Sequence, residues 1–237
     1  MTERSSRHLE RGLDFYRLGP SQVHWHNDQL IIDVREWANP LPRRIEGRIV
    51  LHPQQLFQKI ETLDSLGRHR WGPIAPMARL EVDFPKPGIR WSGHGYLDTN
   101  EGDEPIDRPF LDWDWSRADH AEGHCSVIYD VRQRDGREIL LARRYLPSGQ
   151  VETFEPPARR PLGATPTGWR IHRQLRYEGQ PPSRVQTLED TPFYARSMAS
   201  EWAENEPVQL MHETLHLNRL VSPIVQWMLP WRMPRRG

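Results

Sequence analysis

Four chemically capable side chains recur at every second position of one short segment near the middle of the chain. They are His94, Tyr96, Asp98 and Asn100. In an extended strand, residues i and i+2 share a face, so the spacing predicts one row with an imidazole, a phenol, a carboxyl and an amide. The residues between them are small or weakly polar, and the glycines among them permit close approach of another group. Such a row is typical of a solvated strand face or of a catalytic barrel interior.

A second pair of interest is His69 and Trp71, which share a face if their segment is extended. An exposed histidine beside a core tryptophan is the plainer interpretation of this pair. Trp113 and Trp115 have the same spacing, which places two indoles on one face.

The elements that must position these residues are predicted to be strands. Alternation with period two is found over 23–26, 30–34, 44–51, 78–84, 89–100 and 168–177. A hairpin is predicted from 126–132 and 138–145 around Arg134-Asp135-Gly136. The segment 192–204 matches a helix or a covering loop best. Many short strands favour a barrel or a sandwich, and the Pro/Gly-rich stretch 155–168 is the expected boundary between a larger and a smaller β-unit.

The composition excludes several classes of function. The 237 residues include 32 Lys+Arg and 32 Asp+Glu, so the formal net charge is +0 and a nucleic-acid partner is not expected. No run of about 18 apolar residues occurs. Cys125 is the single cysteine, which favours a reducing cytoplasm. Ten tryptophans predict either an indole-rich β core or an aromatic lining for a long apolar ligand.

Several longer stretches together resemble the acyclic carotenoid 1,2-hydratase family, also called hydroxyneurosporene synthases. The stretches are 18–25 (LGPSQVHW), 40–53 (PLPRRIEGRIVLHP), 67–84 (GRHRWGPIAPMARLEVDF), 95–105 (GYLDTNEGDEP), 110–118 (FLDWDWSRA) and 219–235 (RLVSPIVQWMLPWRMPR). They run in the family's order over nearly the whole chain.

This resemblance implies an all-β fold of tandem lipocalin-like β-barrels, which we place at 1–155 and 156–237. The family has a longer N-terminal part before the stretch that matches Met1 to Arg4, so the first barrel is expected to be incomplete at its N-terminus. The family's proposed catalytic residues fall on His69, Trp71, Tyr96 and Asp98, and all four identities match. These are members of the pairs singled out above.

The implied activity is that of a hydro-lyase that adds water across the C1–C2 double bond of acyclic carotenoids such as neurosporene and lycopene. Asp98 would act as the general acid, because a buried carboxyl stays protonated at neutral pH. Trp71 and Tyr96 would stabilise the resulting tertiary carbocation through their ring faces. His69 would orient or reprotonate Asp98, or bind the attacking water. No metal, nucleotide or redox cofactor is expected.

Around this centre, five further residues are predicted to bind substrate. They are Trp91, His94, Asn100, Trp113 and Trp115. The alternative function is a non-catalytic lipocalin-like protein that binds a carotenoid or another isoprenoid with the same aromatic residues. A third possibility is a related enzyme acting on another polyene, which the match at 219–235 disfavours.

Two features lie near the C-terminus of the sequence. His212-Glu213-Thr214-Leu215-His216 matches the HExxH zinc motif, but the flanking residues alternate as a strand and no His, Asp or Glu follows. A chance match within a β-segment is therefore predicted. The basic and aromatic tail from Leu229 to Gly237 is either a solvated tail or a contact with the surface of the inner or photosynthetic membrane.

Overall fold

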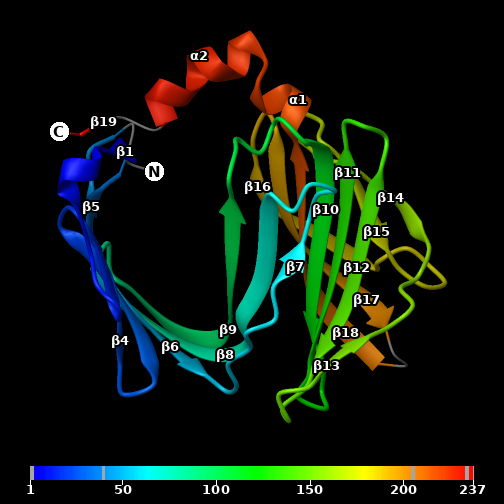
Figure 1. Ribbon diagram of the computed structural model, residues 1–237, viewed down its shortest axis with the longest axis horizontal. Coiled ribbons are helices and arrows are strands. Elements are labelled where there is room, and N and C mark those ends of the chain that lie inside the picture. Colours follow the sequence, from blue (N-terminus) through cyan, green and yellow to red (C-terminus); the bar gives the residue numbers. More distant parts are fainter. Residues whose placement is uncertain (1–2, 39–40, 204–205, 233–234, 237) are drawn as a thin grey trace. The chain divides into compact units, whose positions relative to one another are not determined.

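Antiparallel β-strands make up most of the protein. The computed structural model describes residues 3–38, 41–203, 206–232 and 235–236 (Figure 1). The chain divides into two compact units. Unit 1 comprises Met1–Leu56, Ala75–Leu97 and Gln226–Gly237, and unit 2 comprises Phe57–Ile74 and Asp98–Val225. The chain passes between the units within two of its strands, β8 (His69–Lys86) and β9 (Ile89–Gly102).

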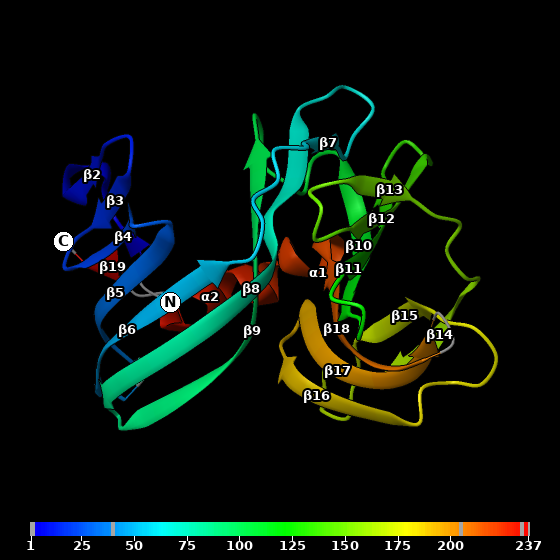
Figure 2. The same ribbon diagram turned by 90° about the horizontal axis from the view of Figure 1, so that it is seen from below.

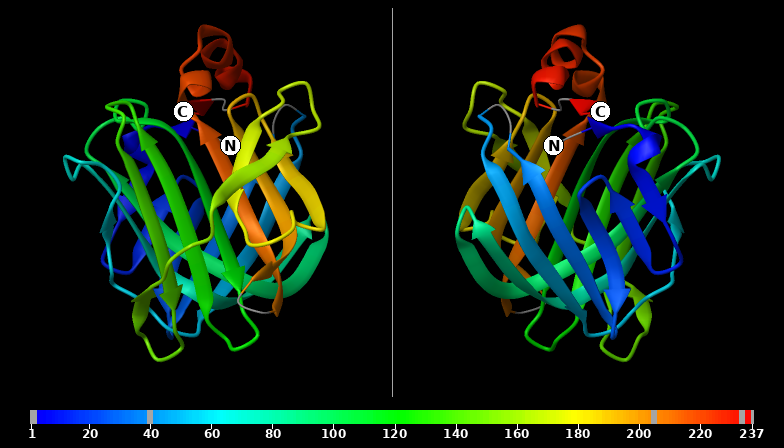
Figure 3. Two further views of the ribbon diagram at one scale, coloured as in Figure 1. Left: turned by 90° about the vertical axis from the view of Figure 1, so that its right-hand side faces the viewer. Right: turned by 90° about the vertical axis from the view of Figure 1, so that its left-hand side faces the viewer.

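The main sheet of unit 1 runs in the order β2-β3-β4-β5-β6-β8, with β9 also paired to β8. The bounds are β2 (Leu9–Arg11), β3 (Phe15–Leu18), β4 (Ser21–His26), β5 (Gln29–Trp37) and β6 (Arg44–Pro53). A short 3-10 helix precedes it at Ser6–His8, and β1 (Glu3–Arg4) pairs in parallel with β19 (Arg235–Arg236). The right panel of Figure 3 shows the blue strands of this sheet side by side.

The strands predicted over 23–26 and 30–34 are confirmed as parts of β4 and β5, which a two-residue turn joins. Asn27 and Asp28 have φ of 48° and 60°, the left-handed region that a two-residue hairpin turn requires. Alternation then directs Leu30 of β5 and Leu51 of β6 to one face, where they pack with Ala75 of β8. This cluster is the core of unit 1, because Trp25, Leu80 and Leu97 pack around it.

Unit 2 is built on a seven-stranded antiparallel sheet in the order β13-β12-β11-β10-β18-β17-β16 (Figure 2). Its strands are β10 (Phe110–Asp119), β11 (Cys125–Gln133), β12 (Glu138–Tyr145), β13 (Val151–Thr153), β16 (Arg184–Asp190), β17 (Tyr194–Ala203) and β18 (Glu206–His216). The left panel of Figure 3 shows β10, β11 and β12 as neighbouring green strands. The predicted hairpin is thus confirmed as β11 and β12, with Gly136 at φ 86° in its turn.

A two-stranded ribbon packs against this sheet and closes the core of unit 2. It consists of β14 (Arg159–Ala164) and β15 (His172–Arg176). Leu175 from the ribbon and the adjacent Tyr177 pack with Ala118, Ala199 and Leu210 of the sheet. The remaining elements of the chain are β7 (Glu61–Thr62), which pairs with the start of β8, and the helices α1 (Leu217–Leu220) and α2 (Pro223–Arg232).

Two local expectations differ from the structure. The segment 192–204, expected as a helix or covering loop, contains strand β17, because backbone pairing with β16 and β18 on both sides overrides local preference. Its buried small residues Ala195, Ser197 and Ala199 recur with period two, which was the overlooked signal. The strand predicted over 168–177 is shorter, because β15 begins at His172 and Arg170 before it has a φ of 45°.

The predicted boundary at residue 155 lies inside unit 2, between β13 and β14. The two compact units therefore do not coincide with 1–155 and 156–237, and a division into those two barrels stays a prediction.

Gly47 offers a test of the packing in unit 1. It lies at a register shift of β6, where an added Cβ would come within 2.5 Å of the Asp83 carbonyl oxygen. Because backbone cannot move aside cheaply, we expect Gly47→Ala to lower the free energy of unfolding by about 1–3 kcal/mol in a denaturant titration. Gly168→Ala is the control, since nothing lies within 4 Å of its added Cβ. Equal stability of the two variants would contradict this packing.

Candidate active site

The pairing of β9 with β8 brings two of the predicted catalytic residues into direct contact. The Trp71 indole Nε1–H donates a hydrogen bond to Asp98 Oδ2 at 2.7 Å. Trp71 is 1% exposed, whereas Asp98 is partly buried. A hydrogen bond to a carboxylate is worth about 1.5–3 kcal/mol, more than a bond between neutral groups. This contact is the centre of the candidate site.

Around Trp71 lies a chain of five rings, which we call the aromatic cluster. It consists of His69, Trp71, Phe110, Trp113 and Tyr129. Trp71 contacts Tyr129 edge to face at 5.3 Å, and Tyr129 contacts Trp113 at 6.0 Å. Phe110 then contacts Trp113 at 5.9 Å and His69 at 4.9 Å. These distances fall in the range that aromatic pairs prefer. Strands β8, β10 and β11 of unit 2 supply all five rings.

His69 is held tightly at the start of β8. Its backbone N–H donates to Asp64 Oδ1 at 2.6 Å, and a Cβ added at Gly102 would lie 2.9 Å from its Nδ1. The side chain is buried, yet its Nε2 has no hydrogen-bond partner among the described residues. A buried polar atom without a partner is costly, so this nitrogen is a good place for a water or a substrate hydroxyl.

The ionisation of nearby groups follows from burial and from the acids around them. Burial, reinforced by the negative charge of Asp98, raises the pKa of Tyr129 well above its usual value. Burial, with the charge of Glu61 beside it, does the same for Tyr145. Both phenols therefore stay neutral at physiological pH. The Tyr145 hydroxyl has no hydrogen-bond partner among the described residues.

Glu61 and Arg143 form an ion pair beside Trp71. Glu61 is the register partner of Trp71 in the β7–β8 pairing, and it accepts from Arg143 Nε at 2.6 Å. Burial tends to raise the pKa of Glu61, but the hydrogen bonds from Arg143 and Lys59 outweigh it and lower that pKa. Glu61 thus stays a carboxylate and ties β7 to β12, which supports the strand that carries Trp71.

The structure distributes the other predicted residues more widely. Tyr96 precedes Asp98 by two positions on β9 and is half-buried, but it belongs to unit 1. His94 and Asn100 of the same row are exposed. Trp115 is buried in β10 opposite Tyr129. The opposite row behaves as its glycines predicted, since a Cβ added at Gly95 would lie 2.5 Å from Leu80 Cγ.

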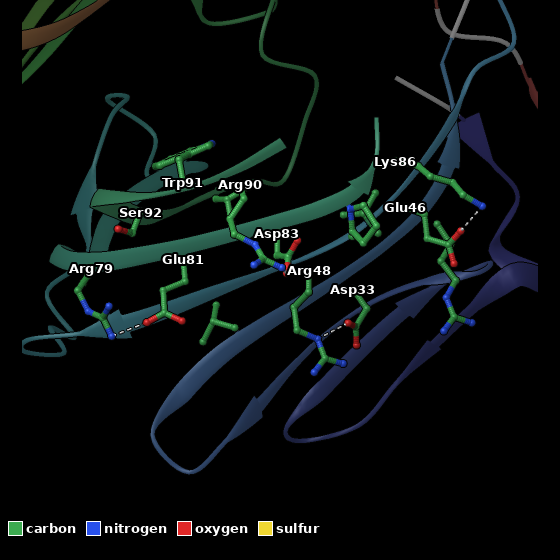
Figure 4. Close-up of a pocket in the computed structure, with 16 residues that line it drawn as sticks. Asp33, Glu46, Arg48, Arg79, Glu81, Asp83, Lys86, Arg90, Trp91 and Ser92 are labelled. Carbon is green, nitrogen blue, oxygen red and sulfur yellow. Dashed lines mark hydrogen bonds and ion pairs between the residues drawn. The ribbon is translucent and has the colours of Figure 1, made fainter. Parts of the chain in front are cut away.

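Trp91 lies in a different setting from the aromatic cluster. It lines an open groove of about 1060 Å³ on unit 1, together with Val34, Val50 and many charged side chains (Figure 4). The charges form ion pairs across the groove, among them Arg48 with Asp33 and Arg90 with Asp83. A groove that is lined by ion pairs suits a polar ligand better than a hydrocarbon. Substrate binding by Trp91, His94 and Asn100 remains a prediction.

The HExxH segment lies on β18, which confirms the predicted strand. His212 Nε2 donates to the Gln174 carbonyl at 2.8 Å, and His216 Nε2 donates to the His172 carbonyl at 2.9 Å. Both imidazoles therefore bind the backbone of β15. Among the described residues, no group of three His, Cys, Asp or Glu side chains has a geometry that could hold a metal ion.

The same region contains a buried acid, Asp114. It accepts hydrogen bonds from Thr214 at 2.5 Å and from Arg159 at 2.6 Å, and His212 Nε2 lies 3.6 Å from it. Burial tends to raise the pKa of Asp114, but its contacts with His212, Thr214 and Arg159 outweigh burial, so that the pKa is lowered. Asp114 joins the β14–β15 ribbon to the sheet.

Sequence reasoning did not single out Tyr129 or Phe110. Tyr129 belongs to the alternating row Val127, Tyr129 and Val131, which is buried. This row is typical of an ordinary β core, and only the tertiary structure places its tyrosine between two tryptophans.

No helix in the described part of the chain is long and apolar enough to cross a membrane.

Comparison with solved structures identifies a protein with a similar fold. A crystal structure described as AttH from Nitrosomonas europaea matches over 90% of this chain and 72% of its own, with a TM-score of 0.64 at 13% identity. The match concerns the fold alone. It supports the predicted lipocalin-like all-β fold class. On this fold, the candidate site is a carboxylate that is hydrogen-bonded to an indole.

The sequence comparisons identify the family. The model of the carotenoid hydratase CrtC matches residues 1–237. The acyclic carotenoid 1,2-hydratases of Rubrivivax gelatinosus and Thiocapsa roseopersicina are 52% and 47% identical over the whole chain. That of Cereibacter sphaeroides is 36% identical, and the chain covers 84% of it. This chain belongs to the CrtC carotenoid hydratase family. It spans 58% of the length of the first two relatives.

The lowered pKa of Asp114 predicts a pH-dependent contribution to stability. The stabilisation is present above the ordinary aspartate pKa and is lost as pH falls through the lower folded-state value. Asp114→Asn should lower the free energy of unfolding near neutral pH by about 3–5 kcal/mol, because Arg159 loses its buried partner. Its stability should also fall less steeply than that of the wild type below about pH 4.

Denaturant titrations across the acid range measure this effect. Asp135→Asn, in the exposed β11–β12 turn, is the matched control. Parallel pH profiles for wild type and Asp114→Asn would show that Asp114 has no such role.

Proposed function

We propose that this chain carries the acid-catalytic centre of an acyclic carotenoid 1,2-hydratase, with Asp98 as the acid. Hydration adds one water across the terminal C1–C2 double bond of an acyclic carotenoid such as neurosporene, lycopene or a 1-hydroxy derivative, and gives a tertiary alcohol. The supporting observation is the hydrogen bond between Trp71 and Asp98 beside the aromatic cluster. Membership of the family supports the substrate class.

The first step is proton transfer from Asp98 to C2. This step requires the protonated form of Asp98, and because Oδ2 accepts the indole N–H, the proton to be donated would be carried on Oδ1. The π electrons of the double bond form the new C2–H bond, and the electron pair of the O–H bond remains on Asp98. The positive charge develops at C1, since a tertiary cation is more stable than the alternative at C2.

Aromatic faces stabilise that cation. A desolvated ring contributes up to about 2 kcal/mol, and two rings would supply on the order of a thousandfold in rate. Trp71 is buried and already donates to Asp98, so its main contribution is to the acid. Trp113 of unit 2 is half-buried and so is not fully enclosed by its neighbours. The proposal therefore assigns Trp113 the larger share of cation stabilisation, and a contribution from Tyr96 rests on the match to the family's catalytic residues.

Water attack at C1 completes the reaction. The unpartnered Nε2 of His69 is a suitable acceptor for a hydrogen of the attacking water. The oxygen forms the C1–O bond while the departing proton passes to Nε2, a step that requires the imidazole tautomer protonated on Nδ1. Transfer of that proton back to the Asp98 carboxylate, directly or through solvent, restores the starting state. Atoms and charge balance without a further reactant.

A non-catalytic carotenoid-binding protein is the alternative. It would use the same rings but has no need for a carboxylate bonded to a buried indole, and a partly buried acid weakens the binding of a hydrocarbon. The Trp71–Asp98 pair therefore favours the enzyme.

Asp98→Asn tests the acid directly. The amide oxygen can still accept the indole N–H, so the fold should persist, but proton donation is lost. We expect formation of 1-hydroxylated product from lycopene to fall by at least about a hundredfold, the lower end of general-acid contributions. Asp103→Asn, in an exposed pair with Arg70, is the control and should retain wild-type activity. Unchanged turnover in Asp98→Asn would exclude Asp98 as the acid.

We propose in addition that the C-terminal helix binds the surface of an anionic membrane, the phase in which such a substrate dissolves. Helix α2 and its approach expose Val221, Ile224 and Trp227, at 41%, 67% and 71%. Ile224 and Trp227 are three positions apart on α2, so they lie on one side of that helix. From Thr214 to Gly237 the sequence has four arginines and no acid. Apolar side chains beside cationic residues suit an anionic interface.

Vesicle flotation measures this binding. The chain should float with phosphatidylglycerol vesicles more than with phosphatidylcholine vesicles. Ile224→Ser/Trp227→Ser should bind at least about tenfold more weakly, because it removes the apolar area available for insertion. Leu188→Ser, which changes an exposed leucine of β16, is the control. Equal flotation of the double variant and the wild type would refute docking through α2.

A further inference from the structure

We infer that Tyr129 is a positioning residue: its ring holds the Trp71 indole in the orientation that lets the indole N–H reach Asp98. The inference deepens the proposed function, since it concerns the same site. It assigns a role to a residue of β11 that has no part in the reaction steps above.

Trp71 needs such support because its bond to Asp98 depends on direction. A hydrogen bond weakens steeply as the donor angle departs from linearity, and an indole has a single N–H at a fixed place on its ring. A rotation of the ring therefore moves the N–H away from Oδ2. The observed N···O length of 2.7 Å lies at the short end of the range for N–H···O hydrogen bonds.

Tyr129 is placed to prevent that rotation. Its ring meets the indole edge to face, with centroids 5.3 Å apart and planes at 84°. This geometry depends on the orientation of both rings, so it restricts the rotation of each. On its other side, Tyr129 contacts Trp113 at 6.0 Å and 79°. Tyr129 thus lies between two indoles and is itself 3% exposed.

The backbone beneath Tyr129 is fixed as well. β11 is paired on both sides, so Tyr129 lies opposite Trp115 of β10 and Leu141 of β12. A central strand cannot shift without breaking two ladders of hydrogen bonds. Tyr129 is therefore fixed by the sheet of unit 2, and through its ring contact it fixes the orientation of the Trp71 indole on β8.

The ring, and not the hydroxyl, carries this role. Burial and the charge of Asp98 raise the pKa of Tyr129, so its hydroxyl stays neutral. Tyr129→Phe retains the ring contact with Trp71 and should behave like the wild type. Tyr129→Leu removes the ring and should release the indole.

The indole N–H signal of Trp71 in a ¹H–¹⁵N NMR spectrum of the full chain reports the bond without any assay. Trp71→Phe identifies the signal by its loss. In Tyr129→Leu the signal should move toward the position of a free indole, and its N–H should exchange with solvent at least about tenfold faster. In Tyr129→Phe it should stay in place. Tyr129→Met, whose flexible side chain fills more of the space, is measured in parallel in case Tyr129→Leu does not fold.

Kinetics with lycopene provide the second measurement. Tyr129→Leu should lower kcat about tenfold with KM changed less than about twofold, and Tyr129→Phe should retain wild-type kcat. In the Trp71→Phe background, Tyr129→Leu should add less than about a twofold loss, because the two residues act through one bond. Tyr177→Leu, which empties a buried site in another cluster of unit 2, controls for loss of stability and should leave the Trp71 signal unmoved.

The outcomes distinguish a failure of the positioning role of Tyr129 from a failure of the proposed hydratase function. An unmoved Trp71 signal in folded Tyr129→Leu and Tyr129→Met would overturn the positioning role. So would an equal shift in Tyr129→Phe, which keeps the ring. The expected NMR changes in a chain without hydratase activity would support the positioning role and refute the proposed function.

Discussion

The hydrogen bond from the Trp71 indole to the Asp98 carboxylate connects the side chains at the centre of the candidate site. It is possible because β8 and β9 are paired and both residues belong to unit 2. One member is completely buried and the other only partly, so the donor is fixed while the acid remains accessible to a ligand. The residues around this hydrogen bond hold the indole and its strand in place.

That support comes from aromatic contacts on one side and from charge on the other. The aromatic cluster orients the indole by ring geometry, which is specific and involves no titratable group apart from His69 and the neutral Tyr129. The Glu61–Arg143 pair ties down the neighbouring strand by a charged hydrogen bond. Deeper in unit 2, Asp114 joins the ribbon to the sheet in the same way. Buried charges therefore act as cross-links between strands, and the aromatic cluster keeps the surroundings of the acid apolar.

The arrangement is consistent with the chemistry of alkene hydration. An isolated double bond is a weak base, so the acid must be oriented and shielded from bulk water. The same site must admit one water, and the unpartnered Nε2 of His69 provides a polar point in otherwise apolar surroundings. Under the proposed function, attachment of the C-terminal helix to a lipid surface would bring the candidate site to the phase in which the substrate dissolves. Under the proposed function, the site would bind an apolar reactant and a polar one with a small number of buried polar atoms.

The sequence by itself determined many of the strands, the turn of the β11–β12 hairpin, and which candidate residues share a face of a strand. These features depend on local alternation and on turn residues, and both can be recognised in the sequence without knowledge of the tertiary structure. It also determined the family, because the matching stretches extend over the whole chain. It did not reveal that 194–203 is a strand, since pairing with neighbours on both sides decided that segment.

Only the tertiary structure decided which candidates meet. Along the chain, 27 positions separate Trp71 from Asp98, and no pattern in the sequence relates the indole N–H to one carboxylate oxygen. Tyr129 likewise belongs to an ordinary alternating row, and its place between Trp71 and Trp113 comes from the packing of strands distant in sequence. Directional contacts between side chains depend on relative orientation in space, whereas alternation along a strand records only the face to which each residue belongs.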